Sequence, residues 1–237
     1  MTSLVNPADG PCPAKAPRAR ERAKWKRVLA LVGGLIVVYL ILGNLLHRVV
    51  FPLPAPDPDT FPRAGDRFES RVEGVTQRIT SVEDGLAHGE LTLAAGAKGP
   101  PMHYHDGFDE VFTVTEGTLH LALENEVVQL EAGQTYKVAA GVIHRPFNPT
   151  SARVVIHGAI PQTFAACLVQ LYAFFEERGS SEPGLDLLMQ FSVIDPICDT
   201  RPAKPPGFAI AATSAFLAPI ARLAGYRNYD RARSLHP

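Results

Sequence analysis

Residues 103–117 read HYHDGFDEVFTVTEG and residues 133–148 read GQTYKVAAGVIHRPFN, and these two stretches decide the fold. His103 and His105 are two positions apart, so on a strand both side chains point to the same face. Glu110 follows after an Asp-Gly step that can return the chain to that face. His144 can approach from a neighbouring strand. Three imidazoles and one carboxylate predict a site for a divalent transition metal ion such as Fe, Mn, Ni, Cu or Zn.

The residues around both stretches are typical of a small all-β domain. Between about Arg67 and Ile160, short alternating or apolar runs such as GELTLAAG and ARVVIHGAI are punctuated by glycine. Seven or eight closely spaced strands of this kind indicate an antiparallel sandwich or barrel. No segment with the helical period interrupts them, which argues against a parallel α/β sheet.

The two stretches resemble the two sequence motifs of the cupin superfamily. The first motif, H-x-H-x(3,4)-E-x6-G, is matched in full by residues 103–117. The second motif, G-x5-P-x-G-x2-H-x3-N, is matched by residues 133–148 except that Ala139 replaces the proline. The fifteen residues between the motifs are the short spacing of small single-domain cupins. The resemblance implies a mainly β fold, the cupin-type double-stranded β-helix (jelly-roll) barrel, over residues 67–160.

The resemblance also implies which residues form the site. It assigns the metal ligands to His103, His105, Glu110 and His144. Strand parity adds four expected pocket-lining residues, Phe112, Val114, Tyr136 and Val138. The alternative is a barrel that holds no metal, in which the three histidines are merely hydrogen-bonded.

Two classes of function are compatible with these residues. Resemblance to cupins implies dioxygenases, isomerases, epimerases and decarboxylases that act on a small organic molecule, and in such a reaction Glu110 would detach and serve as a base. The other class is a non-catalytic module that binds or senses a small ligand in the same pocket. The fold alone does not choose between them, because this barrel hosts many activities. A homodimer is the assembly that the resemblance implies.

The N-terminal part of the chain predicts a membrane anchor. Residues 28–46, VLALVGGLIVVYLILGNLL, carry no charge, and as a helix they would rise about 28 Å, close to the roughly 30 Å hydrocarbon core. Residues 1–27 hold seven Lys/Arg and two acids, which predicts a single-pass topology with a cytoplasmic N-terminus and an exported (periplasmic or extracellular) barrel. A cleaved signal peptide and a buried core helix are the alternatives.

We expect five segments along the chain. They are a basic cytoplasmic segment at 1–27, a transmembrane helix at 28–50, a proline-rich linker at 51–66, the barrel at 67–160 and a helical extension at 161–237. The linker has a proline at 52, 54, 56, 58 and 62, which favours a stiff, extended spacer.

The extension after the barrel reads as helical. One helix face with Phe164, Leu168, Leu171 and Phe175 ends at Gly179, and a shorter helix is expected over 185–191. Residues 208–221 are uncharged, and they predict a helix that packs on the barrel, lies on the bilayer or spans it. In an exported domain Cys167 and Cys198 could form a disulfide, although the sequence does not fix their distance.

The amino-acid composition argues against some classes of partner and site. The 237 residues carry 23 basic and 24 acidic side chains, for a net charge of −1. Nucleic acid is therefore not an expected partner. The three cysteines, Cys12 included, form no C-x-x-C pair that would indicate a structural zinc or a redox motif.

Overall fold

The computed structural model describes residues 18–50, 52–203 and 207–236. The chain divides into two compact units, Met1–Leu45 and Leu46–Pro237, and each is described here by itself. Most of the expected basic segment, residues 1–17 with Cys12, lies outside the described residues.

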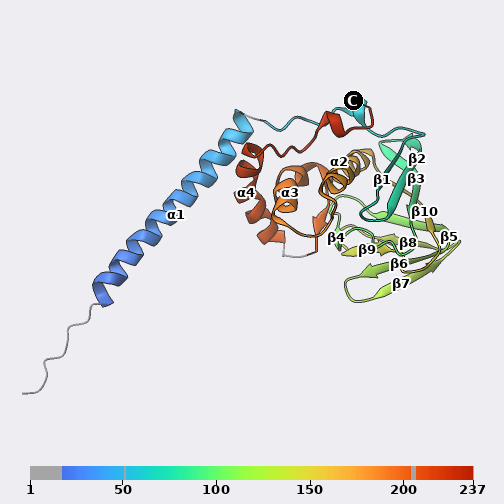
Figure 1. The fold of residues 1–237 in the computed structure, drawn as a ribbon, viewed down its shortest axis with the longest axis horizontal. Helices are drawn as coiled ribbons and strands as arrows, with labels where there is room; N and C mark the ends of the chain where they lie inside the picture. Colours follow the sequence, from blue (N-terminus) through green and yellow to red (C-terminus); the bar gives the residue numbers. More distant parts are fainter. Residues whose placement is uncertain (1–17, 51, 204–206, 237) are drawn as a thin grey trace, which may run out of the picture. The chain divides into compact units, whose positions relative to one another are not determined.

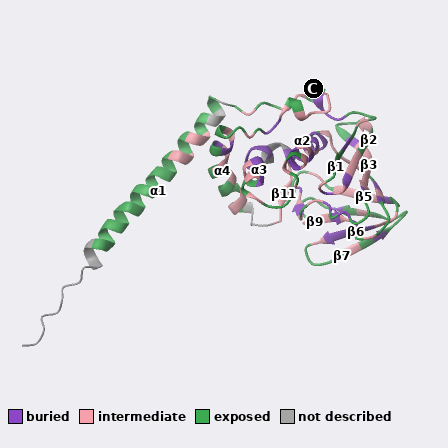
Figure 2. Cartoon of the chain, viewed as in Figure 1, coloured by how far each residue is buried: buried purple, intermediate pink, exposed green. Residues whose placement is uncertain are grey.

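Helix α1 runs over Arg18–Val49 and supplies the described residues of the first unit. Within it, the 26 residues Glu21–Leu46 are long and apolar enough to cross a membrane. Large apolar side chains such as Leu29, Leu35 and Ile41 are exposed along its length (Figure 2). Its length and apolar composition meet the requirement for a helix that crosses a bilayer.

Two antiparallel sheets form the barrel, as the sequence predicts (Figure 1). Their strand orders are β1-β2-β3-β10-β5-β8 and β11-β4-β9-β6-β7. The strands are β1 (Arg67–Ser70), β2 (Val75–Glu83), β3 (Leu86–Leu93), β4 (His103–Tyr104), β5 (Glu110–Glu116), β6 (Thr118–Leu123), β7 (Val127–Glu131), β8 (Thr135–Val138), β9 (His144–Phe147), β10 (Val154–Pro161) and β11 (Arg201–Pro202).

The number of strands differs from the expectation. Residues 67–161 contain ten strands rather than seven or eight. A four-residue turn separates β1 from β2, and β4 is only two residues long, too short for an alternating pattern to reveal. β11 lies outside the expected barrel altogether, because the C-terminal extension adds it beside β4.

The inward-facing side chains of both sheets make one core. Val114, Val154, Leu119 and Leu121 are completely buried, and they alternate with more exposed neighbours along their strands. The same core continues into the first helix of the extension, where Phe175 is 4% exposed. The barrel and the extension therefore fold around a shared interior.

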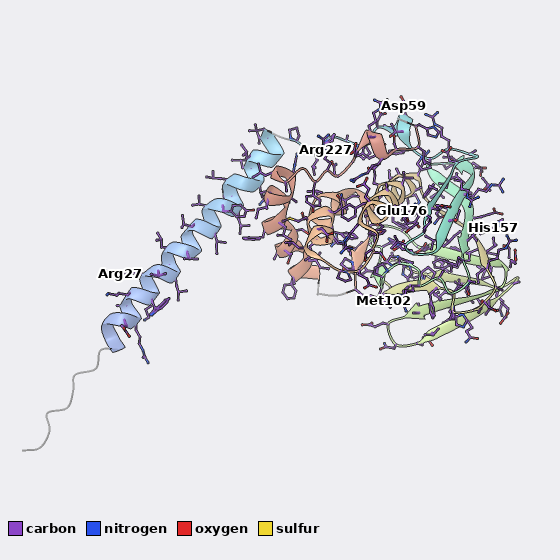
Figure 3. All side chains as sticks on the ribbon, viewed as in Figure 1. Arg27, Asp59, Met102, His157, Glu176 and Arg227 are labelled. Carbon is purple, nitrogen blue, oxygen red and sulfur yellow. A yellow bond between two sulfur atoms is a disulfide. The ribbon has the colours of Figure 1, made fainter. Side chains whose placement is uncertain are left out.

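Helix α2 (Gln162–Arg178) is the predicted amphipathic helix and ends at Gly179, whose φ of 70° is the left-handed conformation of a C-terminal cap. Glu176 on α2 accepts hydrogen bonds from the backbone N–H groups of Arg71 and Val72, which docks the helix on the turn between β1 and β2 (Figure 3). Helix α3 (Leu185–Cys198) continues beyond the expected end at residue 191 and stops at Asp199.

Helix α4 (Gly207–Leu223) packs against α3, another helix of the extension, whereas the sequence predicts that this segment packs on the barrel, lies on the bilayer or spans it. Ala221 is completely buried, while Phe208 and Leu223, near the two ends of the helix, are 80% and 83% exposed. Helix α4 has 17 residues and is not a candidate membrane span. Among the described residues, Glu21–Leu46 is the single helix long and apolar enough to be one.

The proline-rich linker is not a free spacer throughout, in contrast to the expectation. Thr60 and Phe61 are buried, and Thr60 Oγ1 contacts the hydroxyl of Tyr229. The side-chain amide of Asn228 donates to the carbonyl of Pro54 at 3.0 Å. Pro58–Thr60 form a short 3-10 helix, and the proline carbonyls of the extended part remain free acceptors through which the linker can dock on the C-terminal tail.

Candidate metal centre

Four predicted ligands converge between the two sheets. His103 on β4 pairs with His144 on β9, His105 follows β4, and Glu110 begins β5 of the other sheet. One ligand atom from each residue lies within 4.8 Å of every other. His103, His105 and His144 are 9%, 2% and 1% exposed, so the cluster is almost entirely shielded from solvent.

Hydrogen bonds orient all three imidazoles in the same way. His103 Nδ1 lies 2.8 Å from the carbonyl of Pro101, and His144 Nδ1 lies 2.9 Å from that of Val142. His105 Nδ1 lies 2.7 Å from the carbonyl of Asp199. A carbonyl oxygen can only accept, so each Nδ1 carries the proton. Each Nε2 is left facing the centre of the cluster, which is how metal-binding histidines are commonly held.

The inner nitrogens have too few protein partners. His144 Nε2 donates to Glu110 Oε2 at 2.8 Å. His105 Nε2 is 3.5 Å from the same oxygen and is buried without a hydrogen-bond partner among the described residues. A buried polar atom left unpaired is costly, and a divalent ion would satisfy it. The donor set of three imidazole nitrogens and one carboxylate suits a transition metal.

Burial and mutual proximity set the charges of the cluster. Burial, reinforced by His144 and His105, lowers the pKa of His103 to about 3, so this imidazole is neutral and offers a lone pair. Burial alone would raise the pKa of Glu110, but the His105 and His144 side chains outweigh it and hold that pKa well below its usual range. Glu110 in turn raises the pKa of His144 despite burial. Metal binding at His144 Nε2 would therefore release a proton.

Two residues of the second motif, Gly141 and Asn148, hold the backbone around the site by hydrogen bonds. Gly141, at φ 81°, donates its N–H to the carbonyl of His105 at 2.6 Å and so ties the two motifs together. Asn148 is completely buried, and its amide nitrogen lies 2.8 Å and 2.7 Å from the carbonyls of Ala94 and Ala152. Asn148 therefore fastens loops and is not a ligand.

Two aromatic rings cover the cluster on the side of the extension. Phe108 stacks on the His105 ring with 4.3 Å between centroids, and Phe164 of α2 meets the same ring edge-on at 4.8 Å. The two phenylalanines are also in contact with each other. They exclude water from one side of His105, which strengthens electrostatic interactions there.

The cavity next to Glu110 has a volume of about 30 Å³. This is enough for a water molecule or two but not for an organic ligand. Of the four expected pocket-lining residues, Phe112 lines this cavity; the other three, Val114, Tyr136 and Val138, are not among its lining residues. Val114 is completely buried in the core, while Val138 and Tyr136 pair across the strands with Glu110 and Phe112.

Sequence reasoning missed the residues that surround the ligands. The sequence predicts Phe164 only as part of a helix face, and Asp199 lies 94 positions beyond His105 in the chain. No local spacing connects Asp199 with the motifs, so only the path of the extension brings it to the site. The sequence also left open whether Cys167 and Cys198 pair; they form a disulfide with a Cα–Cα distance of 5.4 Å.

Comparison with known proteins points to one family. Residues 89–158 match the family described as Cupin_2, Cupin domain. No curated protein matches the chain significantly.

Among solved structures, a cupin-2 domain-containing protein from Shewanella frigidimarina is 27% identical, with 36% of this chain and 78% of that chain covered and a TM-score of 0.32. A sugar phosphate isomerase from a cupin superfamily, from Silicibacter pomeroyi, is 25% identical over 45% and 74%, with a TM-score of 0.34. A predicted oxalate decarboxylase from Thermotoga maritima is 17% identical over 42% and 92%, with a TM-score of 0.36.

The matched residues contain both motifs and all four converging side chains. The match ends within β10, so it does not include the helices of the extension. The two-sheet barrel of this chain is a cupin domain.

Proposed function

We propose that this chain is a membrane-anchored, metal-binding cupin that works as a metalloenzyme of the dioxygenase or isomerase type on a small organic molecule. The observation that carries the proposal is the set of three Nε2 atoms and one carboxylate that face one another in a buried cluster, with every Nδ1 occupied by a carbonyl. His103, His105, Glu110 and His144 would hold the ion.

A bound divalent ion would supply Lewis-acid chemistry or, if redox-active, one-electron chemistry. The chain's own residues would contribute the rest. Phe108 and Phe164 keep water from His105. Glu110, once released from the ion, would accept a proton at a carboxylate oxygen.

Because the cavity beside Glu110 has a volume of only about 30 Å³, an organic substrate would require its walls to move.

The proposed location is a membrane, with a cytoplasmic N-terminus and the cupin domain on the exported side. The helix Glu21–Leu46 supports the anchor by its length and composition. The disulfide between Cys167 and Cys198 supports the exported side, because such bonds persist in oxidising compartments. A small-molecule ligand and a second copy of the chain are the proposed partners, with lipid around the N-terminal helix.

The second candidate is a non-catalytic module that binds or senses a small ligand. An apolar helix long enough to span a membrane precedes the cupin domain in the sequence, and this arrangement is compatible with a tethered receptor as well as with a tethered enzyme. Oxygen uptake and isomerisation assays of the metal-loaded protein separate the two. Ligand binding without turnover would favour the sensor.

Elemental analysis of the full-length protein, purified in detergent without chelator, tests the metal site. We expect about one equivalent of a transition metal in the unaltered protein and a loss of most of it in His103→Ala/His105→Ala. The matched control is His88→Ala/His157→Ala, which also removes two histidines. His157 is an exposed residue that contacts Glu90 on the outside of the barrel (Figure 3). No metal in the unaltered protein after reconstitution with Fe, Mn, Ni, Cu and Zn would contradict the proposal.

A further inference from the structure

The segment that follows α3 reaches back to the metal ligands. The carbonyl of Asp199 accepts the hydrogen bond from His105 Nδ1 at 2.7 Å, and the hydroxyl of Thr200 is 3.2 Å from the same nitrogen. His103 and His144 instead donate to carbonyls two residues away in their own segments, those of Pro101 and Val142. The barrel alone therefore orients two imidazoles, while the third depends on the C-terminal extension.

The side chain of Asp199 fastens this segment to the first motif. Its two carboxylate oxygens accept the backbone N–H groups of Asp106 and Gly107 at 3.1 Å and 2.7 Å. These residues form the turn between His105 and Glu110, so one carboxylate holds the connection between two ligands. Hydrogen bonds from N–H groups to a charged acceptor are stronger than those between neutral groups.

Strand pairing fastens the segment on its other side. β11 pairs with β4, so that Arg201 lies opposite Tyr104 and Pro202 opposite His103. The N–H of Ala203 donates to the carbonyl of Met102 at 2.9 Å. Two ligand-bearing backbone stretches, at His103 and at His105, are thus in contact with residues 199–203.

The disulfide fixes the point where the segment begins. Cys198, immediately before Asp199, is bonded to Cys167 on α2, and both are buried. Phe164, one helical turn before Cys167, contacts the His105 ring. Asp199 has a φ of 42°, a left-handed conformation that residues other than glycine rarely adopt. The surrounding bonds must therefore hold it there.

We propose that Asp199, held in place by the Cys167–Cys198 disulfide, is a positioning residue of the metal centre that keeps His105 in its Nδ1–H form with Nε2 directed at the ion. This inference rests on the proposed function: residues 67–160 supply all four ligands, and the extension supplies the hydrogen-bond acceptor that orients one of them, His105. Loss of a hydrogen-bond partner behind a metal ligand lowers metal affinity about 10- to 100-fold.

The test uses the full-length protein in detergent with 15N-labelled histidine, and the probes are NMR of the metal-free protein at about pH 8 and Zn²⁺ affinity by competition with a chelator. The variants are Asp199→Ala, Asp199→Asn and Cys167→Ala/Cys198→Ala. Asparagine tolerates the left-handed conformation and keeps one acceptor oxygen, so it should rescue in part. Asp230→Ala is the control, because Asp230 also caps a backbone N–H in the extension, that of Ala232.

We expect Asp199→Ala and the cysteine double variant to shift His105 towards the Nε2–H form while His103 stays Nδ1–H. Their Zn²⁺ dissociation constants should rise about 10- to 100-fold, that of Asp199→Asn less, and that of Asp230→Ala not at all. An unchanged His105 tautomer and affinity would overturn the inference, as would equal disturbance of His103 and His105, which would indicate general loss of structure. If the unaltered protein bound no metal, the proposed function would fail, while the tautomer would still test the role of Asp199.

Discussion

At the scale of single residues, each motif position has a definite physical task. The three histidines direct Nε2 inwards because backbone carbonyls occupy Nδ1, and Glu110 approaches them from the opposite sheet. The sequence shows which residue types stand at these positions. Their protonation is not, because it depends on burial and on neighbours that only the folded chain supplies.

A buried carboxyl outside the site leads to a pH prediction. Glu73 is 3% exposed, and its Oε1 has no hydrogen-bond partner among the described residues. Burial raises the pKa of Glu73 from 4.5 to about 7. The folded state therefore holds a proton that the unfolded state has already lost, so folding stability falls as the pH rises from 4.5 to 7.

We expect Glu73→Gln to raise the free energy of unfolding by up to about 3 kcal/mol at pH 8 and to have little effect at pH 4. Thermal unfolding of both proteins at the two pH values measures this. Glu124→Gln, which changes an exposed glutamate, should have little effect at either pH. A gain at pH 4 equal to that at pH 8 would show that ionisation of Glu73 is not the cause.

At the scale of elements, several motif positions lie in turns between the strands, where the backbone adopts a left-handed conformation. Gly117 ends the first motif between β5 and β6 with a φ of 79°, and a Cβ there would lie 2.6 Å from the carbonyl oxygen of Arg153. Gly133 begins the second motif with a φ of 89°, but no atom lies within 4 Å of its Cβ position. The two glycines have the same backbone requirement and different surroundings.

This pair gives a prediction with its own control. Gly133→Ala should cost about 1–2 kcal/mol for the left-handed conformation alone. Gly117→Ala should cost about 2–4 kcal/mol, because the strands must also move apart. Unfolding in denaturant measures both free energies. Equal losses would mean that the contact with Arg153 adds nothing.

At the scale of the whole molecule, the chain combines a cupin domain with a helix that fits a membrane span and with an extension that shares the barrel core. The proposed orientation is open to direct test. A reporter that is active only outside the cytoplasm, fused after Pro237, should be active, and a reporter that fluoresces only in the cytoplasm should be dark at the same position.

The same two reporters fused before residue 1 should behave in the opposite way, which is the control for expression. Activity of the cytoplasmic reporter after Pro237 would mean that the cupin domain is not exported or that a second segment crosses the membrane. The disulfide makes the exported outcome the expected one.

Local patterns in the sequence predict a small all-β domain, the apolar N-terminal helix and helix α2, and the resemblance to the cupin motifs predicts the barrel type and the four converging residues, because strand parity, motif spacing and helical periodicity are local properties. Four features become visible only in the folded chain: the Cys167–Cys198 bond, the rings over His105, the docked linker and the contact of Asp199 with His105. The physical reason is distance along the chain. Partners separated by 31 to 174 positions leave no periodic signal, and they meet only when a shared core brings the extension against the barrel.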